Sequence, residues 1–160
     1  MLIAVISDSH NNIRAIEAVK KCIEKSDVLI FLGDGEEDIS KITENYKGEI
    51  YSVKGNCDLS NKNPEERIIE ICNNRIFICH GHKYGVKHNY NNIYYRGREL
   101  EADIVLFGHT HIAMIEEFDK ITLMNPGSIS HSYSEFRNSL GFIEIFENNE
   151  KMAWIKELKV

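Results

Sequence analysis

The first half of the chain alternates short apolar runs with an amphipathic stretch. Residues 2–6 and 28–32 are uninterrupted runs of five apolar residues, which is typical of strands buried on both faces. Between them, residues 11–25 carry apolar side chains at helical spacing with charges in between, and this pattern predicts a helix. Residues 36–45 favour a second, weaker helix, and residues 50–53 favour a third buried strand. The order strand, helix, strand predicts a parallel sheet covered by helices.

The second half has a different pattern, dominated by β-rich segments that come in pairs. Each pair flanks a short polar turn and predicts a hairpin: residues 67–71 with 75–79, residues 112–118 with 121–124, and residues 141–146 with 152–158. Residues 90–101 predict a helix, although Gly97 weakens that pattern, and residues 104–107 form another buried strand. We therefore expect an α/β fold in a single domain over residues 1–160. It would have two packed sheets with helices outside, parallel early in the chain and antiparallel late.

Composition narrows the class of protein. The chain has 160 residues, of which 42% are hydrophobic and 28% charged, and this is enough apolar material for a core of its own. No apolar run approaches the roughly 20 residues of a membrane span. The first residues lack the basic region of a secretory signal, and the four scattered cysteines contain no CxxC pair. We expect a cytoplasmic protein with reduced thiols and no contact with a membrane.

Charge limits the expected partners. The net charge is −6, whereas a protein whose main task is to grip a nucleic-acid backbone usually carries the opposite sign. A local basic patch stays compatible with this value, but a long polyanionic substrate is disfavoured. We expect a small substrate rather than a nucleic acid. The sequence leaves a homo-oligomer, either a dimer or a tetramer, open.

Polar motifs follow five of the predicted strands, and four of these motifs contain glycine. They are Asp8-Ser9-His10, Gly33-Asp34, Gly55-Asn56-Cys57-Asp58, Cys79-His80-Gly81-His82 and Gly108-His109-Thr110-His111. Ligands of open α/β sheets bind beyond the carboxyl ends of the strands, so these side chains can meet although they lie far apart in sequence. Two carboxylates, an amide and at least four imidazoles suit Mn, Fe, Co, Ni or Zn better than Ca or Mg. Such a set exceeds one tetrahedral site and fits two adjacent ions that share a carboxylate.

These five motifs, in this order, resemble those of the calcineurin-like metallophosphoesterases. In spacing they are most similar to the small bacterial and archaeal phosphodiesterases of the YfcE type, and the resemblance covers the whole chain, including Asn125-Pro126-Gly127-Ser128. Each motif alone is a weak signal, whereas the five in order are specific. The resemblance implies a four-layer α/β/β/α sandwich of two mixed sheets, with a metal site at the carboxyl ends of the strands.

The resemblance also implies a set of metal ligands. One ion would be held by Asp8, His10, Asp34 and His111, and the second by Asp34, Asn56, His80 and His109, with Asp34 as the bridge. A hydroxide between the ions would attack phosphorus in line, and the metals would neutralise the developing charge. The two divalent ions would be Mn²⁺ in the first place, with Ni²⁺, Co²⁺, Zn²⁺ or Fe²⁺ as alternatives. Asp34, Asn56 and His80 would thereby also be catalytic.

Residues beside the predicted ligands have more than one interpretation. His82, the fourth candidate catalytic residue, would orient His80 or touch the substrate, and the alternative is an ordinary loop histidine. Asp58 would hydrogen-bond a neighbour of the ligands or stabilise a turn. His109 and His111 are two residues apart, so in an extended segment they would point the same way.

Two positions depart from the family pattern or stay open. Phe31 occupies the histidine position of the HxGD pattern that family members often carry, and no loss of a metal ligand is expected there. Members often have Pro and Arg soon after the NPGS motif, but residues 129–137 contain no Pro. The role of Arg137 is therefore open.

The implied function is hydrolysis of small phosphodiesters, with two alternatives. The first is a non-catalytic scaffold similar to Vps29, a retromer subunit with the same fold and a degraded metal site. The second is a phosphomonoesterase of the same superfamily. The presence of His10, His80, His109 and His111 favours an enzyme over the scaffold. Many monoesterases of the family carry His where this chain has Cys57, and a neutral thiol is a weak hydrogen-bond donor, which favours diesters.

Overall fold

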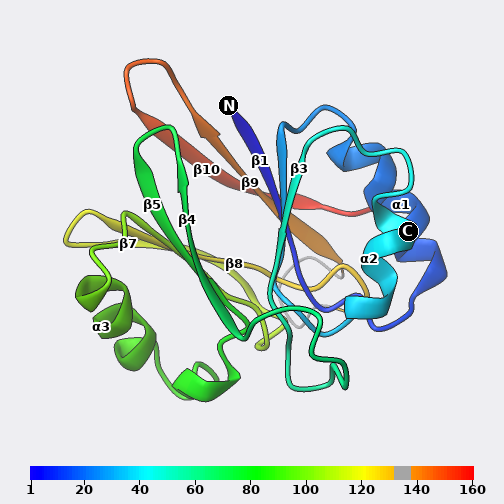
Figure 1. Ribbon diagram of the computed structural model, residues 1–160, viewed down its shortest axis with the longest axis horizontal. Coiled ribbons are helices and arrows are strands. Elements are labelled where there is room, and N and C mark those ends of the chain that lie inside the picture. The colour runs from blue at the N-terminus through cyan, green and yellow to red at the C-terminus, as the bar shows by residue number, and fades with distance from the viewer. Residues whose placement is uncertain (132–137) are drawn as a thin grey trace.

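Two five-stranded sheets pack face to face in the computed structural model, which describes residues 1–131 and 138–160 (Figure 1). Sheet A has the strand order β10-β9-β1-β2-β3, and sheet B has the order β4-β5-β6-β8-β7. The strands of sheet A are β1 (Leu2–Ile6), β2 (Val28–Phe31), β3 (Glu49–Ser52), β9 (Ser139–Ile145) and β10 (Lys151–Glu157). The strands of sheet B are β4 (Glu66–Ile71), β5 (Asn74–Cys79), β6 (Ile104–Leu106), β7 (Ala113–Phe118) and β8 (Ile121–Pro126).

Both sheets are mixed. In sheet A, β1 pairs in parallel with β2, and β2 with β3, while β9 and β10 add in antiparallel fashion beyond β1. In sheet B, β6 is parallel to both of its neighbours, β5 and β8, and the hairpin partners β4 and β7 form the two edges. The predicted parallel start and the two mixed sheets are confirmed, but the second half of the chain is antiparallel only in part. Its hairpins do form, yet β5, β6 and β8 pair in parallel with one another because the connections cross over between them.

Alternation along the strands divides the core into layers. On β1, Ile3 and Val5 point into the apolar layer between the two sheets, whereas Ala4 and Ile6 point outward to α1 (Ile13–Ile23) and α2 (Ile39–Ile42). On the other side of the molecule, α3 (Asn91–Glu99) covers the outer face of sheet B. Figure 1 shows this arrangement of helix layer, sheet, sheet and helix layer. The predicted four-layer α/β/β/α sandwich is confirmed.

The helices begin and end where local chemistry requires. Asn12 caps α1, because its side-chain oxygen accepts a hydrogen bond from the N–H of Ala15 at 3.2 Å. The weaker predicted helix over residues 36–45 is only a 3₁₀ turn, η1 (Glu36–Asp38), followed by the four-residue α2. Glu36 and Asp38 are buried because their carboxylates bind neighbouring loops. Because these carboxylates bind neighbouring loops, the segment does not form a longer amphipathic helix.

Three local features differ from the sequence pattern or refine it. Strand β3 is an edge strand with exposed residues at its start, so the expectation of a third fully buried strand is wrong. The turns Cys72-Asn73 and Asp119-Lys120 both have positive φ at their two residues, which matches the twist of a tight hairpin. A second 3₁₀ turn, η2 (His82–Tyr84), follows β5.

Among the described residues, no helix is long and apolar enough to cross a membrane.

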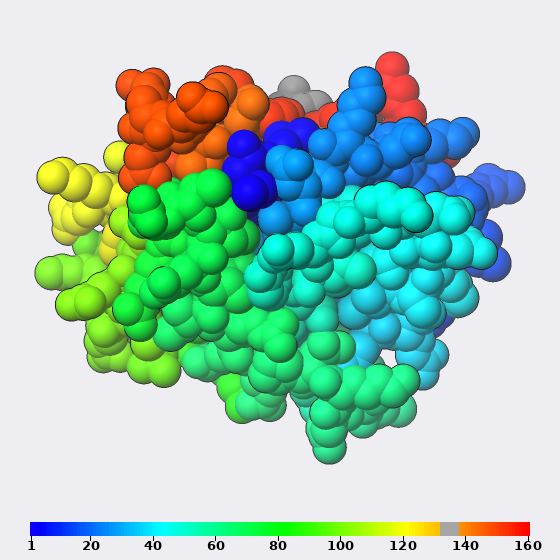
Figure 2. Space-filling view, turned by 45° about the horizontal axis from the view of Figure 1, so that its top comes forward, coloured from blue at the N-terminus to red at the C-terminus, as the bar shows by residue number. Residues whose placement is uncertain are grey.

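The segment between β3 and β4, residues 53–65, projects from the molecular surface. It is the blue-green part that extends from the lower edge of Figure 2. Leu59 in this segment is 98% exposed. The segment contains Asn56, Cys57 and Asp58, so part of the predicted site lies at the base of an exposed loop.

Candidate metal centre

The predicted ligands lie on loops that leave the carboxyl ends of strands in both sheets. Asp8 and Asp34 follow β1 and β2 of sheet A, whereas His80 follows β5 of sheet B, and His109 and His111 follow β6. Asp8, Asp34, His109 and His111 have a positive φ, whereas His80 does not. Non-glycine residues in that region cost of order 1–3 kcal/mol and persist where the surroundings fix them, which is typical of functional sites.

One close group consists of Asp8, His10 and His111. Their ligand atoms lie within 4.8 Å of one another, and Asp8 is fully buried. The Oδ1 atom of Asp8 is 3.0 Å from Nε2 of His111 and 3.7 Å from Nε2 of His10. The Nδ1–H of His111 donates to the carbonyl oxygen of His131 at 2.8 Å. This bond fixes the ring so that Nε2 faces Asp8.

A second close group consists of Asp8, Asp34 and His80, all buried and with ligand atoms within 4.8 Å of one another. The Nδ1–H of His80 donates to the carbonyl oxygen of Leu32 at 2.7 Å, and its Nε2 is 3.3 Å from Oδ2 of Asp34. Asp8 thus belongs to both groups, and Asp34 also forms a third group with His10 and Cys57. The two carboxylates are therefore close both to His10, which follows a strand of sheet A, and to histidines that follow strands of sheet B.

The electrostatics keep these carboxylates ionised. Burial acts to raise the pKa of Asp34, but the close contact with His80 and its charge, together with the Cys57 N–H, outweigh it and lower the pKa to about 2. For Asp8 burial also opposes ionisation, and His10 and His111 nevertheless hold its pKa well below the usual range. Burial and the charge of His80 lower the pKa of His109 to about 4. Two carboxylates and a neutral imidazole at pH 7 are the protonation states that metal ligands need.

Orphaned buried atoms test whether divalent ions fit here. Oδ1 of Asp8 and Nε2 of His80 are inaccessible to solvent and form no hydrogen bond within the described residues, and each faces another ligand atom, Nε2 of His111 at 3.0 Å and Oδ2 of Asp34 at 3.3 Å. Leaving such atoms unpaired costs free energy, so native sites normally supply a partner, an ordered water or an ion. Carboxylate oxygens and imidazole Nε2 atoms converging on one point are the donors that Mn²⁺, Zn²⁺ or Co²⁺ accept. The residues present fit divalent metal ions.

The histidines after β6 do not point the same way, and this expectation was wrong. The backbone of His109 and His111 is left-handed, with φ of 69° and 58°, instead of extended. The His109 ring lies 5.1 Å from that of His80, whereas the His111 ring lies 5.4 Å from that of His10. The two histidines therefore face opposite ends of the site, although His109 belongs to none of the close groups.

Two further candidates lie near the groups without joining them. Asn56 is exposed, and its side-chain amide donates to the sulfur of Cys57 at 3.4 Å. The backbone N–H of Cys57, the next residue, donates to the Asp34 carboxylate at 2.8 Å. The His82 ring lies 5.5 Å from His80 and 6.1 Å from His109, and its Nδ1 is buried with no partner among the described residues. Arg137 lies outside the described residues.

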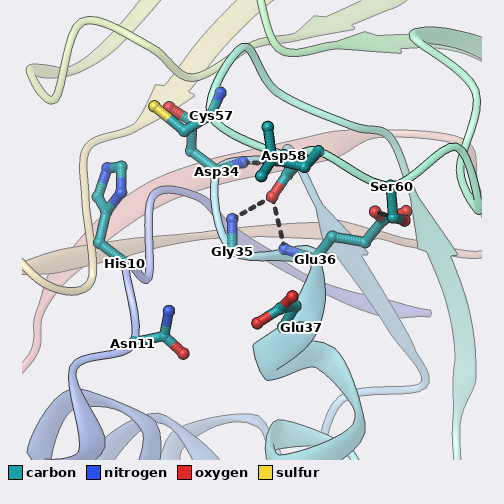
Figure 3. A pocket seen from close by; sticks show the side chains of 10 residues that line it. His10, Asn11, Asp34, Gly35, Glu36, Glu37, Cys57, Asp58 and Ser60 are labelled. Carbon is teal, nitrogen blue, oxygen red and sulfur yellow. Dashed lines mark hydrogen bonds between the residues drawn. The ribbon is translucent and has the colours of Figure 1, made fainter.

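Carboxylates outside the ligand set hold the ligand loops in place. Asp58 accepts hydrogen bonds from four backbone N–H groups, those of Asp34, Gly35, Glu36 and Gly55, at 2.7 to 2.9 Å. Figure 3 shows the bonds to Gly35 and Glu36. Both interpretations of Asp58 are thus combined, because the turn that it stabilises is the one that carries Asp34.

Sequence reasoning missed other supports of the same kind. The buried Asp38 accepts from the Ser9 hydroxyl at 2.6 Å and from the Asn11 N–H at 2.9 Å, and so fixes the loop of His10. Ser128 donates to the carbonyl oxygen of Asp8 at 2.8 Å. Asn125 donates to the carbonyl oxygen of Gly108 at the same distance. Asn125 and Ser128 belong to the NPGS motif that the resemblance includes. In contrast, no feature of the sequence indicated the role of Asp38 except its place in an acidic stretch.

A cleft of about 230 Å³ opens beside the site. Its lining contains His10, Asn11, Asp34, Gly35, Glu36, Glu37, Cys57, Asp58, Leu59 and Ser60. In Figure 3, Asn11 and Glu37 lie across this cleft from Cys57. Cys57 thus lines the cleft beside the proposed metal ligands.

Comparisons with known proteins relate this geometry to a family. Residues 1–148 match the model of the calcineurin-like phosphoesterase superfamily domain. The probable metallophosphoesterase YsnB of Bacillus subtilis is 37% identical over 131 residues, which cover 81% of this chain and 75% of that protein. A predicted phosphoesterase from Streptococcus pneumoniae has a similar structure, with a TM-score of 0.79, 28% identity and 97% of each chain covered.

Two more distant structures share the fold. Vps29 of Entamoeba histolytica, solved with Zn²⁺, has a TM-score of 0.77 and 23% identity over 99% of this chain and 100% of its own. The phosphoesterase YfcE of E. coli has a TM-score of 0.70 and 20% identity, with the same coverage of both chains. At these identities the similarity concerns the fold, and it includes both a phosphoesterase and a vacuolar sorting protein.

Proposed function

The chain belongs to the calcineurin-like phosphoesterase superfamily, and from this premise we propose that it uses two divalent metal ions to hydrolyse small phosphodiesters. The observation that carries the proposal is the set of buried ligand atoms that face one another without a hydrogen bond: Oδ1 of Asp8 lies 3.0 Å from Nε2 of His111, and Nε2 of His80 lies 3.3 Å from Oδ2 of Asp34. These atoms belong to carboxylates and imidazoles that come from both sheets. With the ring protons on Nδ1, each contact joins two acceptors, and a bound cation satisfies both of them.

The proposed ligand set is the one that the motifs suggest. Asp8, His10, Asp34 and His111 would hold one ion, and Asp34, Asn56, His80 and His109 the other. When bound, the ions would lower the pKa of a water molecule and neutralise charge that develops on the phosphoryl oxygens. The carbonyl oxygens of Leu32 and His131 hold the Nδ1–H groups of His80 and His111, so that Nε2 of each ring faces an aspartate of the proposed site.

Preference for diesters is supported by the environment of Cys57. Burial and the neighbouring Asp34 carboxylate raise the pKa of the Cys57 thiol to about 11, so in the metal-free protein the thiol is neutral at pH 7. A neutral thiol offers little charge to a phosphate and little help to a leaving oxygen. A monoester dianion needs more compensation at this position than a diester monoanion. We therefore propose that diesters react faster than monoesters. We propose Mn²⁺ as the metal to test first and the cytoplasm as the place where the protein acts.

The scaffold alternative follows from the structural similarity to Vps29. Against it stand the intact histidines of the site, because His10, His80 and His111 all belong to close groups with a buried aspartate. The monoesterase alternative shares the same metal centre and differs only in the groups around the substrate. His82 is its natural candidate for an acid, since its ring lies beside His80 and His109.

One experiment separates the three functions. The metal-loaded protein should hydrolyse bis(4-nitrophenyl) phosphate with a higher kcat/KM than 4-nitrophenyl phosphate, which has the same leaving group. The variant Cys57→His should raise the monoester rate relative to the diester rate, within the roughly 10²–10⁴-fold range of general acid catalysis. A higher kcat/KM for the monoester in the unmodified protein would contradict the diesterase, and no hydrolysis of either ester would favour the scaffold.

The matched control tests the metal centre itself. Asp34→Asn should lose bound metal, measured by elemental analysis, and should lose activity by at least about 100-fold, because an amide is a weaker ligand than a carboxylate. Asp119→Asn changes an exposed aspartate that does not line the cleft, and it should keep both. Two ions per chain and full activity in Asp34→Asn would show that Asp34 is not the bridge.

A further inference from the structure

The cleft beside the metal centre has an uneven distribution of charge. Four of its lining residues are acidic, namely Asp34, Glu36, Glu37 and Asp58. No lysine or arginine lines it in the part of the chain that the structure describes. A site that received a second phosphate or a carboxylate beside the reacting phosphate would need the opposite charge.

Most of these carboxylates are already occupied. Asp34 belongs to the proposed metal site, and Asp58 accepts four backbone N–H groups. Glu36 accepts hydrogen bonds from Asn63 and from the Ser60 hydroxyl. These bonds fix the loops on either side of the cleft and leave the side chains no freedom to turn toward a ligand.

Glu37 is different because its carboxylate is exposed and free. It forms no hydrogen bond and no ion pair with any residue of the described ranges 1–131 and 138–160. Figure 3 shows that its carboxylate and the side-chain amide of Asn11 lie on the same side of the cleft. The Asn11 backbone N–H donates to Asp38, and the Asn11 side chain forms no hydrogen bond with any residue that the structure describes. Two acceptors, a carboxylate and an amide oxygen, are thus available at the far end of the cleft.

We propose that this cleft receives one arm of the phosphodiester and selects an arm that ends in a primary ammonium group, as in an amino-alcohol ester. The inference rests on the proposed function, because the phosphate must lie at the metal centre for its arm to reach Glu37. An ammonium group has three N–H donors and no acceptor, which matches the acceptors of Glu37 and Asn11.

The size of the cleft supports a short arm. Its volume of about 230 Å³ is below the roughly 300–1,000 Å³ that is usual for pockets that enclose a whole small molecule. A two- or three-carbon chain with a terminal nitrogen needs little space, whereas a nucleoside would extend past Leu59 into solvent. The nearly complete exposure of Leu59, 98%, leaves the cleft open at that edge.

One lysine acts on the other end of the metal centre. The positive charge of Lys87 acts on His109, whereas Lys83, in the same turn as His82, is paired with Glu65. A phosphodiester at the metal centre would have Glu37 near one arm and the charge of Lys87 on the side of His109. This asymmetry favours one orientation of a substrate whose two arms differ in charge, with its cationic arm at Glu37.

Two isosteric product analogues test the inference. 2-Aminoethyl phosphate and n-propyl phosphate differ only by an ammonium in place of a methyl group. Both would be measured as inhibitors of bis(4-nitrophenyl) phosphate hydrolysis by the metal-loaded protein. We expect the aminoethyl compound to have an inhibition constant about three- to fivefold lower, the effect of a partly exposed ion pair. The difference should shrink in 0.5 M NaCl because salt screens exposed charges.

Variants locate the effect. Glu37→Gln should make the two inhibition constants equal while leaving hydrolysis of bis(4-nitrophenyl) phosphate near its normal rate, since Glu37 touches no proposed metal ligand. Glu24→Gln removes another exposed carboxylate, one that does not line the cleft, and should keep the full difference. As a readout without catalysis, 2-aminoethyl phosphate should shift the amide NMR signals of Glu37 and Leu59 in the unmodified protein more than n-propyl phosphate does.

The outcomes separate this inference from the function on which it rests. If bis(4-nitrophenyl) phosphate is hydrolysed but the two analogues inhibit equally, the diesterase stands and the ammonium subsite is wrong. A preference for the aminoethyl compound that survives in Glu37→Gln also overturns it. Absence of any diester hydrolysis in the metal-loaded protein overturns the proposed function, and this inference with it.

Discussion

At the scale of single residues, the metal centre depends on carboxylates that bind no metal themselves. Asp58 gathers four N–H groups of the loops that carry Asp34 and Asn56, and Asp38 does the same for the loop of His10. Such anchoring explains how Asp34 can keep a positive φ of 58°. The ligands are therefore positioned before any ion arrives, which favours tight binding.

The first prediction concerns Asp58. Asp58→Ala leaves four backbone donors without their acceptor, so the free energy of unfolding should fall by at least about 2 kcal/mol. Because the Asp34 loop also loses its anchor, the affinity for Mn²⁺ should fall about 10–100-fold, as is typical when a partner of a ligand is removed. Urea unfolding and metal titration measure the two effects. Asp58→Asn, which keeps one acceptor oxygen, should be intermediate in both, and normal metal affinity in Asp58→Ala would contradict the positioning role.

At the scale of elements, close approach between a helix and a sheet explains an unfavourable residue. Gly97 lies in the last turn of α3, and glycine inside a helix costs about 1 kcal/mol relative to alanine. A Cβ built on Gly97 would lie 2.5 Å from Cγ2 of Val105 on β6. Glycine lets α3 pack directly on sheet B. The helix forms because this packing outweighs the low helix propensity of glycine.

The second prediction follows from this contact. Gly97→Ala should destabilise the protein by about 1–3 kcal/mol, the usual cost of overpacking, although alanine is the better helix former. Thermal or urea unfolding measures the change. In the double variant Gly97→Ala/Val105→Ala the cost of the added methyl group should largely disappear, because the clashing atom is gone. A Gly97→Ala variant more stable than the original protein would show that propensity dominates at this position.

At the scale of the whole molecule, the metal centre connects the two sheets. Asp8 and Asp34 come from sheet A, and His80, His109 and His111 come from sheet B. Ions held between them would link the halves of the sandwich at one end. Stability should then depend on metal, even though the apolar layers are complete without it.

The third prediction tests this link. Mn²⁺ at 100 times its dissociation constant should raise the free energy of unfolding by about 2.7 kcal/mol for each occupied site, relative to protein in chelator. His80→Ala should stay folded in chelator, because the core lies elsewhere. Mn²⁺ should raise its free energy of unfolding by less than it raises that of the unmodified protein. Urea unfolding with circular dichroism gives both values. Identical unfolding curves with and without metal would contradict a bound ion at the sheet junction.

The sequence by itself determined the elements and the chemistry of this protein. Alternation and run length identified the strands, because burial on one or two faces leaves a direct periodic record. Turn residues identified the hairpins, including those at Cys72-Asn73 and Asp119-Lys120, because positive φ restricts which residues fit. Five motifs indicated the family because their residues and order resemble those of its members, and side chains at the carboxyl ends of strands can meet at one site.

Only the tertiary structure decided how distant segments meet. The sequence could not show that β6 lies between β5 and β8, because pairing partners leave no periodic signal in either strand. It did not reveal that His109 and His111 turn to opposite ends of the site, since their left-handed backbone depends on hydrogen bonds from remote residues such as Asn125. The free carboxylate of Glu37 became visible only when Glu36 and Asp58 were found occupied. Local patterns specify period and turn, whereas contacts across the fold depend on packing between residues that are far apart along the chain.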